Sequence, residues 1–276
     1  MRITFYGVRG STPSPAEANR RYGGNTAAVV LETTGRDPIV LDLGTGLRMW
    51  GLTLPADGSF RATALVTHIH WDHIQGLPFF PPIDRVGARL DVFAPQQEEG
   101  DLDAVINDFM RPPYFPVQYC DLRGDIRFTA VHDHDFEIGS AKVKARPVPH
   151  CGPTLGYRID WEGASVAYVS DHQAPRTLDT VADSVLELCD GVDLLIHDAQ
   201  YTAEEFEEKA HWGHCTMDYA LLVAREAGAR RLALFHHDPA HSDDELDVLH
   251  GAVRARAREA GGPEVLSARE GLELQI

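Results

Sequence analysis

Four side chains that can bind a metal ion fall within six positions, in the segment Thr67-His68-Ile69-His70-Trp71-Asp72-His73. The segment follows the apolar run 64–66, which is typical of a buried strand. In an extended chain, side chains at i and i+2 point the same way, so His68 and His70 can bind one cation together. Asp72 and His73 come where the chain is expected to turn into a helix, and they can face a second cation. Imidazole and carboxylate ligands suit zinc or another first-row metal, so this motif predicts a metal centre rather than a surface histidine cluster.

Further candidate ligands come at the ends of later strand-like segments. They are His150, Asp171 and His236, and each is followed by Gly, Pro or polar residues typical of a loop. A dinuclear site needs about three or four protein ligands per metal, brought together from distant strand ends. These residues therefore supply what the first motif lacks. His237 directly follows His236, and the sequence leaves open which of the two is the ligand.

This set of residues resembles the metallo-β-lactamase superfamily. The HxHxDH signature of that family matches residues 68–73, and the later ligands match in the right order. The resemblance covers nearly the whole chain. It implies an α/β fold, a four-layer αββα sandwich with the metals at one edge between two sheets. By this resemblance the first metal would be held by His68, His70 and His150, and the second by Asp72, His73 and His236, with Asp171 bridging both.

The length and charge of the chain are compatible with such an enzyme. No Pro/Ser linker, short-period repeat or low-complexity tract divides the 276 residues, so we predict one domain over residues 1–276. The formal charge of −17 argues against a broad basic face that would hold nucleic acid. It does not exclude a phosphate substrate, because two divalent cations reverse the local field in a pocket.

The cysteines and the N-terminal residues indicate the compartment. Cys120, Cys151, Cys189 and Cys215 are scattered without a CxxC pair, which is typical of thiols in a reducing cytosol. The N-terminus runs straight into a strand-like segment without a signal-peptide hydrophobic region. No apolar run approaches the ~18 residues of a membrane span. We therefore expect a cytoplasmic protein with no membrane partner, and the oligomeric state stays open, with a homodimer as one option.

Strand signals dominate the chain. They fall near residues 1–7, 27–33, 38–43, 62–67, 88–94, 125–131, 142–148, 155–160, 165–170, 192–197, 231–236 and 272–276. Helical periodicity is clearest at 216–228 and 243–260, and Ser242 with Glu245 forms a capping box before the second. Residues 96–123 include an aromatic and proline-rich stretch, which predicts a shaped loop. This loop either forms a lid or pocket wall or packs its aromatic rings on the domain.

Two later motifs narrow the chemistry. They are Ile196-His197-Asp198-Ala199, at the end of a predicted strand, and Trp212-Gly213-His214-Cys215-Thr216, at the start of a predicted helix. Both resemble motifs of the phosphodiesterase branch of the superfamily. That branch contains the tRNA 3′-processing endonucleases and the cyclic phosphodiesterases. Asp198 stands where the family has Glu, and Cys215 where it has Ser.

The chemistry of phosphodiester hydrolysis assigns roles to these residues. The reaction expels an alkoxide, which is a poor leaving group unless it is protonated, and a histidine held by a carboxylate can deliver that proton. We therefore predict Asp72, His214 and Asp198 as catalytic residues, with His214 as the general acid and Asp198 as its orienting partner. Alternatively, His214 only caps a loop. Asp198 is equally suited to cap the following helix, and this role does not exclude the orienting one.

The remaining histidines rank lower as site residues. His172 and His197 are expected to orient metal ligands from outside the metal centre. His132 and His134 are expected at a solvated hairpin turn. The last three are expected at the surface or on helices: His211, His241 and His250.

Two substrate classes compete among phosphodiesterases. Processing of tRNA precursors needs a basic protruding arm, and the chain has no long Gly/Lys/Arg-rich insertion. Residues 7–13 and 22–26 resemble the cyclic-phosphodiesterase-like members, and these Gly-rich turns either cradle a phosphate or are simply tight turns. The sequence therefore favours a small, cyclic phosphodiester such as a cyclic nucleotide or a ribose cyclic phosphate, with nucleic acid disfavoured. We expect two divalent metal ions per chain, zinc or alternatively manganese. The alternatives are a tRNA 3′-processing-like endoribonuclease, a thioester or lactone hydrolase of the same fold, and a ligand sensor without activity.

Overall fold

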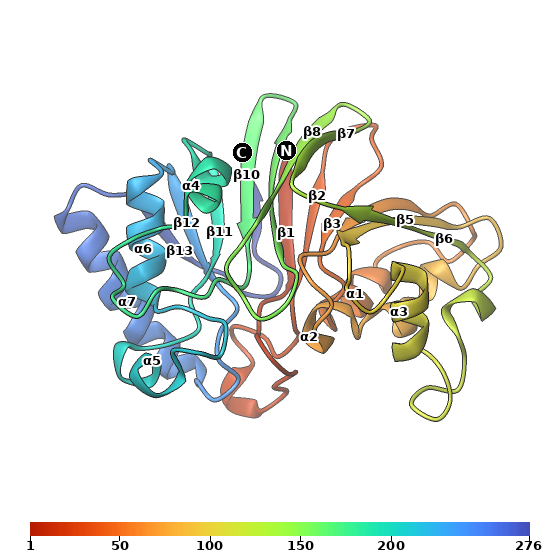
Figure 1. The fold of residues 1–276 in the computed structure, drawn as a ribbon, viewed down its shortest axis with the longest axis horizontal. Helices are drawn as coiled ribbons and strands as arrows, with labels where there is room; N and C mark the ends of the chain where they lie inside the picture. Colours follow the sequence, from red (N-terminus) through yellow and green to blue (C-terminus); the bar gives the residue numbers. More distant parts are fainter.

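Strands make up the centre of the structure, a computed structural model that describes all residues from Met1 to Ile276 (Figure 1). The strands are β1 (Arg2–Gly7), β2 (Ala28–Glu32), β3 (Ile39–Leu41), β4 (Arg61–Leu65), β5 (Arg89–Pro95), β6 (Asp125–Val131), β7 (His134–Ile138), β8 (Ala141–Pro147), β9 (Leu155–Trp161), β10 (Ala164–Val169), β11 (Leu194–Asp198), β12 (Arg231–Phe235), β13 (Glu264–Ser267) and β14 (Glu273–Gln275). The helices are α1 (Gly46–Gly51), α2 (Trp71–Ile74), α3 (Leu102–Phe109), α4 (Asp183–Cys189), α5 (Ala203–Lys209), α6 (Met217–Glu226) and α7 (Asp243–Glu259).

The strands form two seven-stranded sheets. The first sheet has the order β14-β1-β2-β3-β4-β5-β6, and the second has the order β13-β12-β11-β10-β9-β8-β7. Their inner faces share one apolar core, to which the first sheet contributes Ile3 and Phe5 and the second Tyr157 and Phe235. Burial of such side chains is the main force that holds two sheets face to face.

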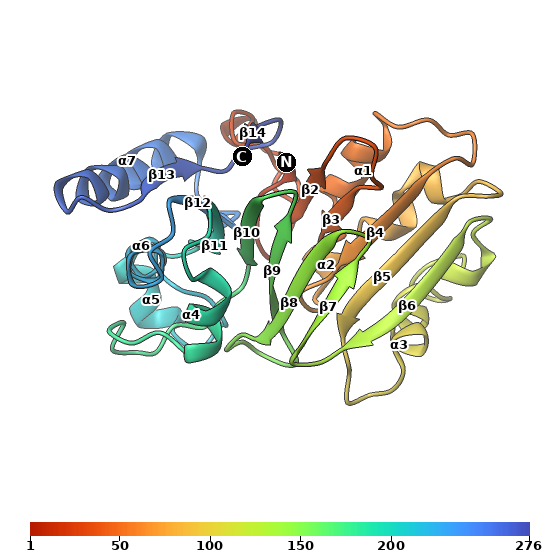
Figure 2. The same ribbon diagram turned by 90° about the horizontal axis from the view of Figure 1, so that it is seen from above.

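Helices cover the outer face of each sheet. Helices α4, α6 and α7 pack on the second sheet, and α1 and α3 pack on the first. Figures 1 and 2 show these two groups of helices on opposite sides of the paired sheets. The order helix–sheet–sheet–helix confirms the predicted αββα sandwich.

Parallel strands place the candidate site residues at one edge of this sandwich. Strands β3 to β6 run parallel in the first sheet, and β10 to β13 run parallel in the second. The carboxyl ends of parallel strands meet at the same edge, so the loops that follow them converge. Two hydrogen bonds join the sheets there: the Leu155 amide donates to the Thr67 carbonyl at 2.9 Å, and the Tyr157 hydroxyl donates to the Val66 carbonyl at 2.8 Å.

Strands β7 and β13 were not among the predicted strand segments. Strand β7 is an edge strand whose side chains are mostly exposed, so it lacks the alternation of buried residues that signals a strand. The expected hairpin turn at His132 and His134 is wrong, because residues 132–133 connect the two sheets and His134 begins β7.

The two strongest helix predictions are confirmed by α6 and α7, including the capping box of Ser242 and Glu245. Residues 96–123 contain no strand, as predicted, but they include helix α3 as well as loops. Helices α1, α3 and α4 have six to eight residues, too short for a clear helical period in the sequence.

Two histidines that were expected at the surface or on helices are buried. His241 is bound to Glu205 Oε1 at 2.9 Å, and His250 lies on the inner side of α7. His211 is exposed, as expected. None of the helices combines the length and the apolar character that crossing a membrane requires.

Candidate metal centre

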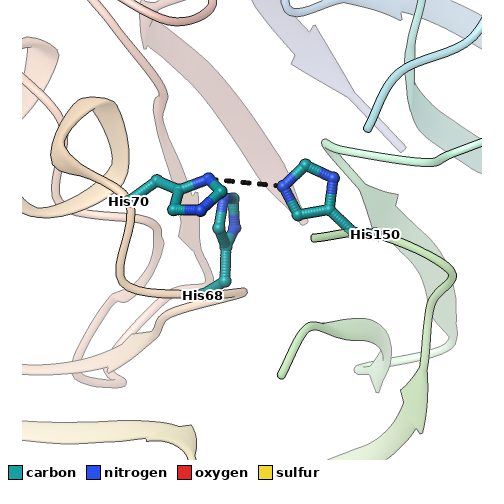
Figure 3. Close-up of side chains that lie close together, drawn as sticks. All are labelled: His68, His70 and His150. Carbon is teal, nitrogen blue, oxygen red and sulfur yellow. Dashed lines mark hydrogen bonds between the residues drawn. The ribbon is translucent and has the colours of Figure 1, made fainter. Parts of the chain in front are cut away.

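The loop after β4 and the first turn of α2 bring the HxHxDH residues to the edge between the sheets. His68 and His70 lie in the loop, and His150 reaches them from the loop after β8 (Figure 3). His70 Nδ1 is 2.9 Å from His68 Nε2 and 3.3 Å from His150 Nε2. Three imidazole nitrogens thus converge on one point.

A second group of side chains lies beside the first. It consists of Asp72 and His73 from α2 and His236 from the loop after β12. Asp72 Oδ2 is 3.1 Å from the Nε2 atoms of both His73 and His236. The two nitrogens and the carboxylate are buried and form a second convergent set.

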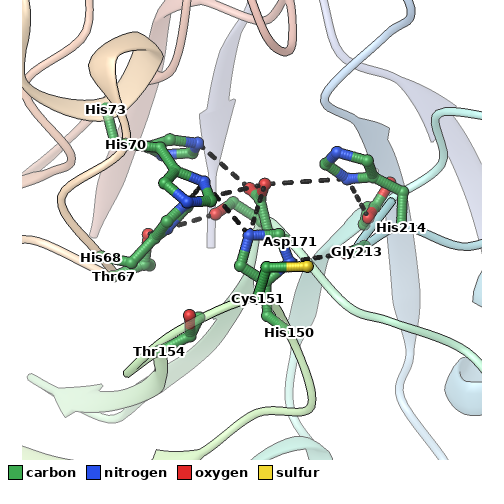
Figure 4. Close-up of polar contacts among 12 residues, drawn as sticks. Thr67, His68, His70, His73, His150, Cys151, Thr154, Asp171, Gly213 and His214 are labelled. Atoms are coloured by element: carbon green, nitrogen blue, oxygen red, sulfur yellow. Dashed lines mark hydrogen bonds and ion pairs between the residues drawn. The ribbon is translucent and has the colours of Figure 1, made fainter. Parts of the chain in front are cut away.

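The Asp171 carboxylate lies between the two groups, at the end of β10 (Figure 4). Its Oδ2 atom is 3.8 Å from the Nε2 atoms of His68 and His150. Its Oδ1 atom is 3.1 Å from His73 Nε2 and 3.3 Å from His236 Nε2. One oxygen therefore faces each group, which is the arrangement of a bridging ligand.

These donors fit divalent cations. His73 Nε2 and Asp171 Oδ1 are buried and have no hydrogen-bond partner in the protein. A buried polar atom without a partner costs about 1–3 kcal/mol, and a bound cation would remove that cost. The set of imidazole nitrogens and carboxylate oxygens suits zinc and similar first-row metals. Each of the two groups could hold one such ion, with Asp171 shared between them.

Hydrogen bonds behind the histidines fix which nitrogen faces the centre. The Nδ1 atoms of four of them contact oxygen atoms, in the pairs His68–Thr67 Oγ1 at 3.1 Å, His73–Asp42 Oδ2 at 2.8 Å, His150–Gly213 O at 2.7 Å and His236–Gln200 Oε1 at 2.8 Å. A hydrogen on Nδ1 leaves the Nε2 lone pair free to bind a metal. The surroundings therefore prepare these rings as ligands.

Burial and charge set the ionisation of these groups. Burial lowers the pKa of His68 well below its usual value, so this imidazole is neutral. Burial alone would raise the pKa of Asp171, but His236, His73 and His68 hold it well below the usual range. The pKa of Asp72 is also held well below its usual value, because His73 and His236 outweigh the effect of burial. Burial would lower the pKa of His73, but Asp72, Asp171 and Asp42 raise it well above its usual value. Neutral imidazole and ionised carboxylate are the forms that bind a cation, so His73 would release a proton when a metal binds.

His214 and Asp198 form a pair next to Asp171. His214 Nδ1 is 3.0 Å from Asp198 Oδ2 and 3.7 Å from Asp171 Oδ2. Burial would lower the pKa of His214, but the charge and hydrogen bond of Asp198 raise it to about 8. Asp198 does not cap the following helix, because Thr202 is the N-cap of α5. Backbone amides of His172 and Gln200 hold the Asp198 carboxylate at 3.1 and 3.0 Å.

Comparison with known proteins decides the family. The family model described as a beta-lactamase superfamily domain matches residues 46–237. This protein is a member of the metallo-β-lactamase superfamily. It belongs to the phosphodiesterase branch of that superfamily, and it is a metal-dependent hydrolase.

Relatives of this metallo-β-lactamase superfamily member share its full length. It is 29% identical to a ribonuclease Z from Natronomonas pharaonis, in a match that covers 96% of each chain. A diphosphatase from the PhnP family is similar in structure, with a TM-score of 0.71, 21% identity and coverage of 100% of this chain and 97% of the other. The short form of human tRNase Z has a TM-score of 0.67, 21% identity and coverage of 100% and 99%.

The structure separates His236 from His237. His236 has a left-handed backbone, with φ of 56°, and its ring joins the candidate metal centre. The His237 ring lies elsewhere, with Nε2 2.8 Å from the Ala268 carbonyl and its centroid 5.0 Å from that of His250. We call His237 and His250 the rear pair. Tyr22 covers both rings edge-on.

Other predicted residues lie near the metal centre of this superfamily member but do not join it. The His172 and His197 rings pair with each other at 3.0 Å and do not hydrogen-bond to any candidate ligand, so their expected orienting role is wrong. Cys215 is a buried neighbour of the Asp198 carbonyl, and Cys151 is exposed.

The N-terminal Gly-rich turns serve the protein itself. The Ser11 amide donates to Asp72 Oδ2 at 2.8 Å. A Cβ atom on Gly10 would lie 2.4 Å from the His236 ring, so only glycine fits there. The Gly23 carbonyl accepts from the buried Arg9 guanidinium at 2.9 Å. These contacts favour the interpretation that the Gly-rich turns are tight turns rather than a phosphate cradle.

Asp42 and Gln200 are positioning residues that the sequence interpretation missed. Asp42 follows β3 and accepts hydrogen bonds from the Thr67 amide at 2.7 Å and the Tyr168 hydroxyl at 2.8 Å, besides its contact with His73. The signal for Asp42 was present, because a carboxylate follows an apolar strand just as Asp171 does. Gln200 carries no such signal, since only the fold brings it to His236.

Proposed function

We propose that residues 1–276 form one catalytic domain that hydrolyses a phosphodiester of a ribonucleotide with two divalent cations, zinc or alternatively manganese. In this proposal His68, His70 and His150 hold one cation, Asp72, His73 and His236 hold the other, and Asp171 bridges them. When bound, such a pair of cations activates water and neutralises the charge on a phosphoryl group. The protein's own side chains then have to orient the substrate and protonate the leaving oxygen.

The observation that carries this proposal is the His214–Asp198 pair beside Asp171. His214 Nδ1 is 3.7 Å from Asp171 Oδ2, so the ring borders the centre at which the substrate phosphate would be held. With Nδ1 bound to Asp198, Nε2 is the atom that can carry a proton to the leaving oxygen. An alkoxide needs that proton, whereas a thiolate released from a thioester departs without one. The pair therefore favours phosphodiester hydrolysis over thioester hydrolysis.

The first candidate substrate is the 3′ end of a tRNA precursor. It is supported by full-length relatives named ribonuclease Z, among them the Natronomonas pharaonis protein with 29% identity. This inference reverses the preference drawn from the sequence, which disfavoured nucleic acid.

The second candidate is a small phosphodiester such as a cyclic nucleotide. It is favoured by the formal charge of −17 and by the absence of a long basic insertion that could grip RNA. The similarity to the diphosphatase concerns the fold alone, so it is compatible with this candidate but does not favour it.

One experiment compares the candidates directly. Metal-loaded protein is incubated with a 3′-extended tRNA precursor, with 2′,3′- and 3′,5′-cyclic nucleotides and with a thioester reporter, and kcat/KM is measured for each. We expect hydrolysis of phosphodiesters only, with the highest kcat/KM for the tRNA precursor. A higher value for a cyclic nucleotide would select the second candidate. Turnover of the thioester alone would refute the proposal.

A further inference from the structure

An aromatic cavity lies beside the candidate metal centre and has no part in the chemistry described above. Its volume is about 610 Å³, within the range of about 300–1,000 Å³ typical of ligand sites. Its aromatic walls come from three separate segments: Trp71 of α2, Phe79 of the following turn, and Phe109, Tyr114 and Phe115 from α3 and the loop after it. We call this the aromatic cavity.

These aromatic rings are unusually exposed. Trp71 is 74% exposed, Phe79 55% and Tyr114 78%. Large aromatic residues normally lose most of their surface to the core, as Trp50, Phe60 and Phe80 do on the same side of the first sheet. Exposure of several apolar rings to water is unfavourable compared with their burial. Clusters of exposed rings therefore mark binding surfaces.

Helix α2 gives side chains to both the aromatic cavity and the candidate metal centre, because Trp71 lines the cavity and Asp72 and His73 belong to the centre. Trp71 stands between His70 and Asp72 in the chain, so one wall of the cavity belongs to the ligand-bearing segment itself. Successive Cα atoms are about 3.8 Å apart, so the backbone positions of Trp71 and of the neighbouring ligands His70 and Asp72 lie within the span of one nucleotide. A substrate whose phosphate lies at the metal centre can therefore place its next group in the cavity.

The remaining wall residues bring polar groups to the same space. Thr45, Gln75 and Asp108 contribute a hydroxyl, an amide and a carboxylate. Groups of this kind form hydrogen bonds with the edge of a base while aromatic rings stack on its face. Asp108 already accepts a hydrogen bond from Arg111 Nε at 2.7 Å, and Thr45 Oγ1 accepts one from the Thr26 amide at 2.9 Å, but both groups can form further hydrogen bonds with an occupant.

We propose that the aromatic cavity binds the nucleobase of the nucleotide adjacent to the scissile phosphate, by stacking between Trp71 and Tyr114. This inference rests on the proposed function, because it assumes that the phosphate lies at the metal centre. It also gives the aromatic stretch in residues 96–123 a task, as a wall for the base. Phe115 contributes rigidity to that wall, since it packs edge-on against Phe79 at 5.6 Å.

The test is a binding measurement that needs no turnover. Isothermal titration calorimetry of the metal-loaded protein compares adenosine 5′-monophosphate with ribose 5-phosphate, which lacks only the base. We expect the nucleotide to bind about 5- to 100-fold more tightly, the range that base stacking supplies. Tyr114→Ala should remove most of this preference, and Tyr114→Phe should restore it because the ring remains.

Matched variants separate stacking from misfolding. Val248→Ala is the control, since Val248 is 73% exposed on α7 and lies outside the aromatic cavity. It should keep the full preference for the nucleotide. Trp71→Ala is the second test of the cavity, with metal content measured to show that the neighbouring ligands still bind.

Several results would overturn the inference. They are equal binding of both ligands by the unmodified protein, no binding of either, or a preference that survives in both Tyr114→Ala and Trp71→Ala. Equal binding together with a dimer that Tyr114→Ala dissociates would mean that a second copy fills the cavity. Failure of the proposed function looks different: the base preference would stand, but methyl p-nitrophenyl phosphate would not be hydrolysed.

Discussion

Two groups of histidines, most of them buried, include the neighbouring residues His236 and His237, yet the rings of these two residues face different surroundings. In the candidate metal centre, imidazole nitrogens converge on one another and on the Asp171 carboxylate. In the rear pair, the bonded nitrogens instead contact neutral oxygens, Ala268 O for His237 and Ser267 Oγ for His250, both at 2.8 Å. Burial of a histidine therefore does not indicate a metal. Convergence of ring nitrogens on a shared carboxylate does.

Substitution of Asp171 should have the largest effect on the metal centre, because this carboxylate is shared by both sets of ligands. Asp171→Asn should lose at least one metal ion and lower kcat on the order of 10⁴-fold, since an amide cannot bridge two cations as a carboxylate does. Elemental analysis and phosphodiesterase assays measure the two effects. Full metal content at an unchanged rate would remove Asp171 from the site.

His214 tests whether a histidine beside the metal centre serves chemistry rather than ligation. His214→Ala should keep the metal ions and slow hydrolysis of a phosphodiester with an alkoxide leaving group by ~10²–10⁴-fold. The loss should be much smaller for bis-(p-nitrophenyl) phosphate, because p-nitrophenolate leaves without a proton. An equal loss on both substrates would indicate a positioning role, and loss of metal would make His214 a ligand.

The pH profile gives an independent check of that role. Only the protonated imidazole can donate, so kcat/KM for the alkoxide substrate should fall as the pH rises through the pKa of His214. Asp198 raises that pKa to about 8, and nearby cations lower it again, so the descending limb should lie at pH 8 or below. This limb should be absent for the p-nitrophenyl substrate.

The adjacent residues His236 and His237 sharpen the comparison. His236→Ala removes a predicted ligand. Loss of a residue that only hydrogen-bonds to a ligand lowers metal affinity roughly 10- to 100-fold, and His236→Ala should lower it by more than that. His237→Ala should keep the metal and lower the free energy of unfolding by about 1–3 kcal/mol, because it leaves the Ala268 carbonyl without its donor. The reverse pattern would reassign the ligand to His237.

The rear pair should also make the fold sensitive to acid. Burial lowers the pKa of His250 to about 3 from a usual value of 6.5, so the unfolded chain binds a proton that the folded protein does not. This contribution to stability is fully present above pH 6.5 and is lost as the pH falls from 6.5 towards 3, by about 1.4 kcal/mol per pH unit. Urea unfolding at several pH values measures the slope. His250→Gln, which cannot titrate, should have a shallower slope, and an equal slope would contradict the assignment.

The candidate ligands at the strand ends could be predicted from the sequence, because their pattern is local. A ligand-type side chain after an apolar run marked His150, Asp171 and His236, and the resemblance to a known family supplied the sandwich that joins them. Neither Gln200 nor the aromatic cavity could be found this way. Both depend on segments that are far apart in the chain, since Gln200 contacts His236 and the cavity is lined by Trp71 and Tyr114, and no local pattern records such an arrangement.

The Asp42 carboxylate links segments of the two sheets: Thr67 and His73 lie in the loop and helix that follow β4 of the first sheet, and Tyr168 lies in β10 of the second. The position of the candidate ligand His73 therefore depends on how the two sheets are stacked. By contrast, Tyr114 lies in a surface loop outside that joint. The part that would perform hydrolysis is therefore locked to the scaffold, whereas the part that would select a substrate can vary freely. Such a division lets a lineage acquire new substrates without rebuilding its reaction centre.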